Sequence, residues 1–250
     1  MILPLVLMSF VVGAMIGITG MGGAALMAPF LILVVGIRPI TAVGTDLVYG
    51  AVTKIVGACV HLRQGTVDLP AVRRLALGSI PGGLLGAGAV WLLPRHTRDA
   101  ELDVRRAIGG LLVLVAVILL ARMFFPGDPS RERRPSGERA LPLWGAVVGF
   151  CVGFTSVGSG TLLTPILMFL YPKRPATVVG TDVFHAAILV TVTGLVYAGS
   201  RGVEWNLVPV LLAGAIPGVL LGSKLAIRVP PRPLRFMLAV VLLVSAYRMF

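Results

Sequence analysis

The sequence predicts an all-α polytopic membrane protein built from two inverted repeats of about five hydrophobic segments each. Hydrophobic residues make up 57% of the chain and charged residues only 13%, and the mean hydropathy is +0.96. This composition is typical of a membrane protein and excludes a soluble fold. In addition, residues 17–86 align without a gap to residues 153–222, so Gly17 corresponds to Gly153 and Gly86 to Gly222. The chain therefore contains a duplicated membrane unit.

The identities between the two copies concentrate in residues that shape backbones or bind ligands. More than a third of the aligned positions carry the same residue, and many of these are Gly, Pro, Thr or Asp. Gly-Thr-Asp occurs at 44–46 and again at 180–182, and Ile-Pro-Gly occurs at 80–82 and again at 216–218. Duplicated apolar chains with broken helices are typical of secondary transporters.

Ten apolar segments alternate with short polar strips, five in each half. They are 1–18, 24–37, 42–62, 70–93, 105–125, 141–157, 160–171, 176–198, 205–227 and 233–250. Five of them reach the length of about 20 residues that a bilayer core requires, whereas 24–37 and 160–171 are short. We interpret these two as half-helices, since each follows a glycine-rich break, at 17–23 or 153–160. The first pair of each repeat is then either a re-entrant hairpin or two spans.

The domain organisation follows from these segments. Residues 1–125 form the first membrane repeat, 126–140 a polar linker and 141–250 the second membrane repeat. The first pair of segments returns the chain to its starting side and three further spans follow, so the second repeat enters the membrane upside down. Loops on the linker's side carry more Lys and Arg, which predicts a cytoplasmic linker and periplasmic termini. The same loops account for the net charge of +12 without nucleic-acid binding.

The glycine-rich breaks are candidate anion sites. Backbone N–H groups are unpaired where a short helix begins, and the helix dipole favours an anion there. Hydroxyl groups nearby can add donors, and a lysine further along the chain can add a point charge. The alternative is that these glycines only allow close helix packing. The predicted substrate-binding residues are Thr19, Gly20, Gly22, Gly23, Thr155, Ser156, Gly158, Ser159 and Lys54.

Asp46 and Asp182 are carboxylates within apolar segments, where an ionisable group is costly and suggests a function. They could carry a coupling proton, or they could cap the helices that begin after the preceding prolines. His185, one turn after Asp182, is a third coupling candidate because histidine titrates near neutral pH; the alternative is a hydrogen-bonded packing residue. On a helix, one face carries Asp46, Gly50, Thr53, Lys54 and Gly57.

These motifs resemble the TauE/SafE sulfite exporter family, of the 4-toluenesulfonate uptake permease group. The resemblance rests on the glycine-rich run 17–23, on Pro29 and Pro39, on Val-Gly-Thr-Asp at 43–46, and on their repetition in the second half. It covers nearly the whole chain. It implies transport of sulfite, sulfonates or related small organosulfur anions across the bacterial inner membrane, often as export. The second copy departs from the first by Ser156 for Gly20, Ser159 for Gly23 and His185 for Tyr49.

We therefore expect a secondary transporter and not an enzyme, with export coupled to a gradient of protons or sodium ions. A passive anion channel is the alternative. An intramembrane aspartyl protease is disfavoured, because the Gly-x-Gly-Asp pattern of such enzymes is not met by Gly-Thr-Asp at 44–46. The expected partners are the lipid bilayer and a small anion such as sulfite or a sulfonate. We expect neither a cofactor nor a metal, and the sequence allows a homodimer.

Overall fold

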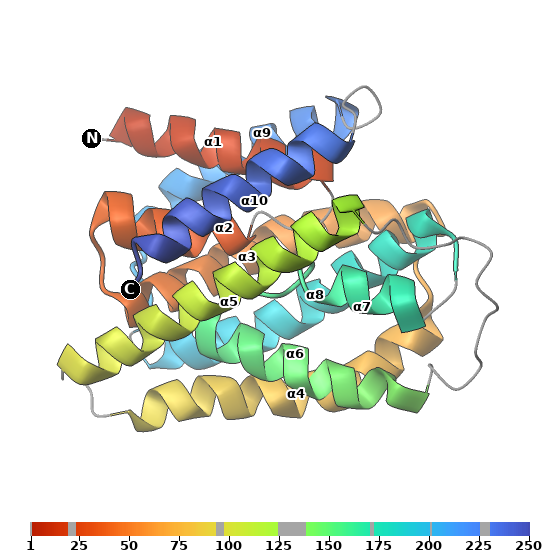
Figure 1. Cartoon of the computed structure of the whole chain (residues 1–250), viewed down its shortest axis with the longest axis horizontal. Helices are drawn as coiled ribbons and strands as arrows, with labels where there is room; N and C mark the ends of the chain where they lie inside the picture. Colours follow the sequence, from red (N-terminus) through yellow and green to blue (C-terminus); the bar gives the residue numbers. More distant parts are fainter. Residues whose placement is uncertain are drawn as a thin grey trace.

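The chain folds into α-helices that lie roughly along one direction (Figure 1). A computed structural model describes residues 2–19, 24–93, 98–124, 139–170, 173–200, 202–225 and 231–250. The first repeat contains α1 (Ile2–Thr19), α2 (Ala24–Phe30), the π-helical turn η1 (Leu31–Val35), α3 (Pro39–Arg63), α4 (Leu69–Leu92) and α5 (Arg98–Phe124). The second contains α6 (Leu141–Thr155), α7 (Leu163–Leu170), α8 (Pro175–Gly199), α9 (Leu207–Leu225) and α10 (Pro231–Tyr247). No strand occurs among the described residues, in agreement with the predicted all-α class.

Helix starts coincide with prolines in both repeats. Pro39 and Pro175 occupy the first positions of α3 and α8, where the missing N–H costs nothing and the fixed φ suits a helix. Asp68 caps α4, because its Oδ1 accepts a hydrogen bond of 3.2 Å from the backbone N–H of Ala71. The repeated Arg-Pro pair at 38–39 and 174–175 thus marks where each central helix begins.

The helices differ in length. Among the described residues, α3, α4, α5 and α8 are long and apolar enough to cross a membrane, and the other apolar helices are shorter. The short helices predicted in each half are present: α2 has 7 residues and continues into the 5 residues of η1, and α7 has 8. At a rise of about 1.5 Å per residue, α2 with η1 is about 18 Å long and α7 about 12 Å, well below a hydrocarbon core of about 30 Å. Neither short segment can cross a bilayer alone.

The second short helix begins later than the sequence predicts. Residues 156–162 form turns, and α7 starts at Leu163 instead of near residue 160. The cause is a run of left-handed backbone: Ser156 has φ 62°, Gly158 has φ 119° and Gly160 has φ 96°. Glycine tolerates this conformation without steric cost, so the last two glycines of the break serve the turn itself.

The two repeats are inverted. Along the chain, α1 runs away from the N-terminus while its counterpart α6 runs in the opposite direction, and α5 and α10 are likewise antiparallel (Figure 1). Both termini lie at one end of the molecule, which we call the terminal side. The end at which α3 and α5 finish and α6 and α8 begin is the linker side. Packing obeys the same symmetry, because α4 lies against α6 as α9 lies against α1, and α3 meets α8.

Glycines allow these helix pairs to approach closely. A Cβ placed on Gly82 of α4 would collide with the carbonyl oxygen of Ala146 in α6. At its counterpart Gly218 in α9, a Cβ would collide with the carbonyl oxygen of Phe10 in α1. Phe10 and Ala146 correspond in the same register of the two repeats, so the contact occurs once in each half. Small residues commonly permit such backbone contact between membrane helices.

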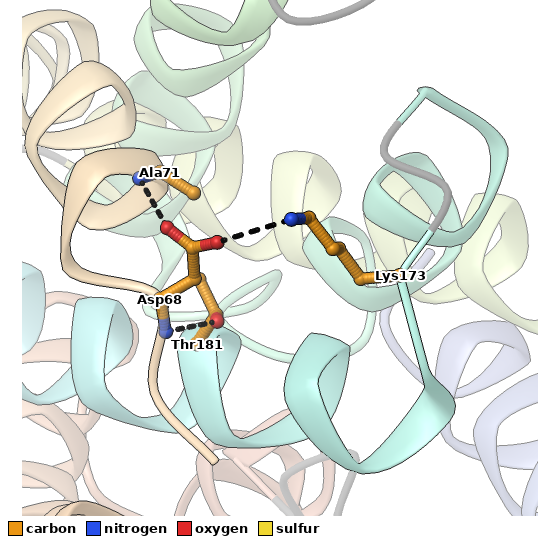
Figure 2. Close-up of polar contacts among 4 residues, drawn as sticks. All are labelled: Asp68, Ala71, Lys173 and Thr181. Carbon is orange, nitrogen blue, oxygen red and sulfur yellow. Dashed lines mark hydrogen bonds and ion pairs between the residues drawn. The ribbon is translucent and has the colours of Figure 1, made fainter. Parts of the chain in front are cut away.

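Loops of one repeat are anchored on the central helix of the other. The backbone N–H of Asp68 donates to Oγ1 of Thr181 at 3.0 Å, and the N–H of Glu204 donates to Oγ1 of Thr45 at 2.9 Å. Figure 2 shows the first of these contacts, together with Lys173, whose Nζ lies 3.9 Å from Oδ2 of Asp68. The threonine of each Gly-Thr-Asp motif is therefore a structural anchor.

We predict that Gly82→Ala destabilises the protein, because the added methyl group has no room against the α6 backbone. Overpacking of this kind costs about 1–3 kcal/mol, which thermal unfolding in detergent would register as a lower Tm. Gly88→Ala, on the same helix, is the matched control. A Cβ at Gly88 meets no atom of the described residues within 4 Å, so alanine there should leave Tm unchanged or raise it. Equal Tm values for both variants would contradict the close crossing.

Candidate functional site

A cavity of about 110 Å³ lies where α3, α8 and the break before α7 meet. It has room for several water molecules, or for one small anion in their place. All five residues predicted to share one face of α3 line it, from Asp46 to Gly57. The full lining comprises Ile16, Gly17, Asp46, Tyr49, Gly50, Thr53, Lys54, Gly57, His61, Ser159, Gly160, Asp182, Val183, Ala186 and Val219.

Asp46 is buried within α3 and does not cap that helix. The N-cap position is Arg38, and it makes no side-chain cap. The side chain of Asp46 is 2% exposed, and its Oδ2 accepts a hydrogen bond of 2.7 Å from the hydroxyl of Ser156 in the opposite repeat. Its Oδ1 is buried and has no hydrogen-bond partner among the described residues. One carboxylate oxygen is thus engaged by the protein and the other is not.

Asp182 has the same place on α8 and is also not a cap, since Arg174 occupies the N-cap position. Its Oδ2 accepts a hydrogen bond from the hydroxyl of Thr164, and its Oδ1 is buried without a partner in the described part of the chain. Sequence reasoning did not identify Thr164. The sequence signal that could have identified it is a hydroxyl residue at the second position of the otherwise apolar helix α7.

Lys54 is the cation of this cavity. Its Nζ donates to the backbone oxygen of Ser159 at 3.3 Å and to the hydroxyl of the same residue. Across the described ranges, the ammonium makes no direct ion pair with Asp46 or Asp182. The ammonium is therefore held by a neutral partner on the break, and no carboxylate neutralises it by direct contact.

Several predicted site residues lie elsewhere or serve the backbone. His185 is buried and faces α4, where its Nε2 lies 2.6 Å from the hydroxyl of Ser79. It does not line the cavity, and this position agrees with the alternative of a packing residue. Thr155 donates its hydroxyl to the carbonyl of Cys151 at 2.7 Å and accepts from the N–H of Val157 at 3.2 Å, so its side chain binds the backbone at the end of α6.

The remaining candidates divide between the break and the chain outside the described residues. Ser156 binds Asp46 and Gly158 shapes the turn, while Ser159 lines the cavity. The side chain of Thr19 and the whole of Gly20, Gly22 and Gly23 lie outside the described residues.

Sequence reasoning missed two lining residues with polar side chains, Tyr49 and His61. The hydroxyl of Tyr49 is buried and has no partner among the described residues, and Tyr49 follows Asp46 by three positions. His61 lines the cavity seven positions after Lys54, and its Nδ1 lies 3.0 Å from Oγ1 of Thr66. Both belong to the predicted face of α3 by helical spacing, so extending that face by one turn would have found His61.

The cavity therefore combines one ammonium with two carboxylates in an apolar setting. Buried charges are expensive unless they are paired or bind a ligand. The free oxygens of Asp46 and Asp182 can accept protons or a hydrogen-bond donor, and Lys54 can hold an anion. This set of groups suits the binding of a small ion together with protons.

Comparisons with known proteins identify the family of the chain. The family model described as sulfite exporter TauE/SafE matches residues 5–249. A probable membrane transporter protein, YjnA of Bacillus subtilis, is 42% identical over the whole of both chains. A second from that organism, YdhB, is 27% identical over 88% of each chain, and MJ0441 of Methanocaldococcus jannaschii is 24% identical over 97% of this chain and 93% of its own. No solved structure matches significantly. The chain is a membrane transporter that belongs to the TauE/SafE sulfite exporter family.

Proposed function

We propose that the protein moves sulfite, a sulfonate or a related small organosulfur anion across the bacterial inner membrane, as export coupled to an ion gradient. The observation that carries this proposal is the position of the Lys54 ammonium and the partner to which it donates. Its ammonium lies in a cavity between the repeats, and its hydrogen bonds among the described residues go to the neutral Ser159. An anion that takes the place of Ser159 as the acceptor would receive a charge-assisted hydrogen bond from the Lys54 ammonium.

The proposed substrate contacts come from both halves of the molecule. Lys54 and Tyr49 of α3 supply donors from the first repeat, and Ser159 supplies a hydroxyl from the second. Sulfite and sulfonates have several equivalent oxygens, so they can accept from donors on different sides at once. Backbone N–H groups of the glycine-rich breaks complete the proposed site, including those of Gly22 and Gly23.

Asp46 and Asp182 are the proposed coupling groups. An anion bound at Lys54 would add negative charge beside two carboxylates in a cavity of low polarity, which is unfavourable unless protons accompany it. Each aspartate has one buried oxygen with no partner among the described residues, and this atom is available to a proton. We therefore favour protons over sodium ions as the coupling species.

The proposed orientation places the linker in the cytoplasm and both termini in the periplasm. Support comes from the larger number of Lys and Arg residues in loops on the linker side and from the two termini at one end of the molecule (Figure 1). Exported anions would then enter from the linker side.

Flux measurements in proteoliposomes test the substrate class. We expect sulfite or a small sulfonate to be transported, and chloride to be excluded because it lacks several oxygens that can bridge the donors. Transport should respond to an imposed pH gradient. Equal flux of chloride and sulfite, with no response to the gradient, would instead identify a passive anion channel.

Asp46→Asn and Asp182→Asn should each abolish the response of transport to a pH gradient, since an amide cannot carry the coupling proton. The fold should survive, because Asn can still accept the hydroxyl hydrogen bonds. Asp68→Asn is the control: it caps α4 outside the cavity, and Asn caps helices about as well as Asp. If both cavity variants kept a parental response, the aspartates would have a structural role only.

Lys54→Gln should weaken sulfite binding about ten- to hundredfold, the effect of losing one hydrogen bond to a charged group. Binding to purified protein can be measured by calorimetry. Lys173→Gln removes the same charge from an exposed site outside the cavity and should leave the affinity unchanged. Unaltered binding by the Lys54 variant would remove this residue from the proposed site.

A further inference from the structure

The cavity occupies only one of two equivalent places in the molecule. Along α3 its lining runs from Asp46 to His61, in the last turn of the helix, and so reaches toward the linker side. The first residues of α3, from Pro39 to Thr45, do not line it. The repeat symmetry requires a second, equivalent region along α8 that reaches toward the terminal side.

That equivalent region is closed. In the alignment of the two repeats, Leu189, Val190, Thr193 and Tyr197 of α8 correspond to Thr53, Lys54, Gly57 and His61 of α3. The four residues of α3 line the cavity. The four of α8 are 0–3% exposed and do not line it. The region along α3 thus contains a cavity, whereas side chains fill the equivalent region along α8. We call these regions the hollow half and the packed half.

The helices that face these residues show the same difference. Val219 of α9 lines the cavity opposite α3. Its counterpart Gly83 of α4 lies so close to α8 that an added Cβ would stand 2.8 Å from Cδ1 of Leu189 and 2.8 Å from Cγ2 of Thr193. The packed half therefore has side chains of α8 pressed against the α4 backbone.

A hydrogen bond closes the packed half next to α6. The hydroxyl of Tyr197 donates to the carbonyl oxygen of Gly153 at 2.9 Å, and Tyr197 is 3% exposed. The counterparts of these two residues are His61 and Gly17, and both of them line the cavity. The same pair of positions is joined by a hydrogen bond on the terminal side, whereas both positions line the cavity on the linker side.

We infer that the transport path consists of two half-paths related by the repeat symmetry, and that Leu189, Val190, Thr193 and Tyr197 close the half toward the terminal side. The hydrogen bond from Tyr197 to Gly153 holds this gate closed. The half-path lined by Thr53, Lys54, Gly57 and His61 contains the cavity in the same structure, and we call it the open half. The inference rests on transport through this cavity, and it does not depend on which anion is carried.

The two half-paths also differ in chemistry. The open half offers a hydroxyl, an ammonium and an imidazole, whereas the closed half offers two aliphatic side chains at the positions of Thr53 and Lys54. An anion would therefore bind in the open half, near Lys54. It would pass Leu189 and Val190 only when the hydrogen bond between Tyr197 and Gly153 is broken. Equivalent positions of inverted repeats exchange open and closed packing in this way during alternating access.

Cysteine accessibility tests the gate. In a background with Cys59→Ala and Cys151→Ala, Thr53→Cys reports on the open half and Thr193→Cys on the closed half. The probe is an impermeant methanethiosulfonate that carries a sulfonate, applied to vesicles of either orientation and read by mass spectrometry. We expect Thr53→Cys to react from the linker side, and Thr193→Cys to react at least about tenfold more slowly from either side, since only a minor state exposes it.

Adding Tyr197→Phe should raise the reaction rate of Thr193→Cys from the terminal side about three- to tenfold, the change expected from loss of one buried hydrogen bond. Tyr247→Phe makes the same chemical change at an exposed residue and should have no effect. Leu189→Cys replaces Thr193→Cys if the latter does not fold. Equal rates at the two reporters, or no effect of Tyr197→Phe, would overturn the gate. Sulfite flux is measured separately. If sulfite were not transported, we would still expect this labelling pattern, so the gate and the proposed substrate are tested independently.

Discussion

The close contact of α1 with α9 and of α4 with α6 is the constraint on which the rest of the structure depends. Within lipid, apolar side chains gain little by leaving their surroundings, so helices associate through tight packing and hydrogen bonds. Here glycines such as Gly82 and Gly218 bring backbone against backbone. Each of these pairs joins one helix from each repeat. The two halves of the chain are consequently interlocked, and neither could keep its packing without the other.

This interlocking determines where the polar groups can meet. The central helices α3 and α8 lie against each other, and each also contacts a member of the glycine pairs. Thr45 and Thr181 attach the loops of the opposite repeat to these helices. As a result, the break after α6 comes to lie on α3, where Ser156 reaches Asp46. The cavity is a product of the interface, because its charged groups belong to both repeats.

Much of this arrangement could be predicted from the sequence, because the signals are local or repeated. The segments, the short helices and the shared face of Asp46 and Lys54 depend on spacing alone. The partners of the buried groups could not be predicted, since they depend on which helix of the other repeat lies opposite. His185 contacts Ser79 for this reason. The late start of α7 also escaped prediction, because a left-handed serine at position 156 carries no sequence signal.

Both aspartates accept a hydroxyl hydrogen bond from the second half of the chain, so the duplicated halves contribute different groups to the cavity. The first half contributes the lysine, whose counterpart is Val190. The second contributes three hydroxyls, Ser156, Ser159 and Thr164, whose counterparts are Gly20, Gly23 and Ala28. Two copies of the first half would hold two lysines and none of these hydroxyls, and two copies of the second would hold no lysine at this position. The fused halves are thus no longer interchangeable: neither could rebuild this centre as a symmetric pair of identical subunits.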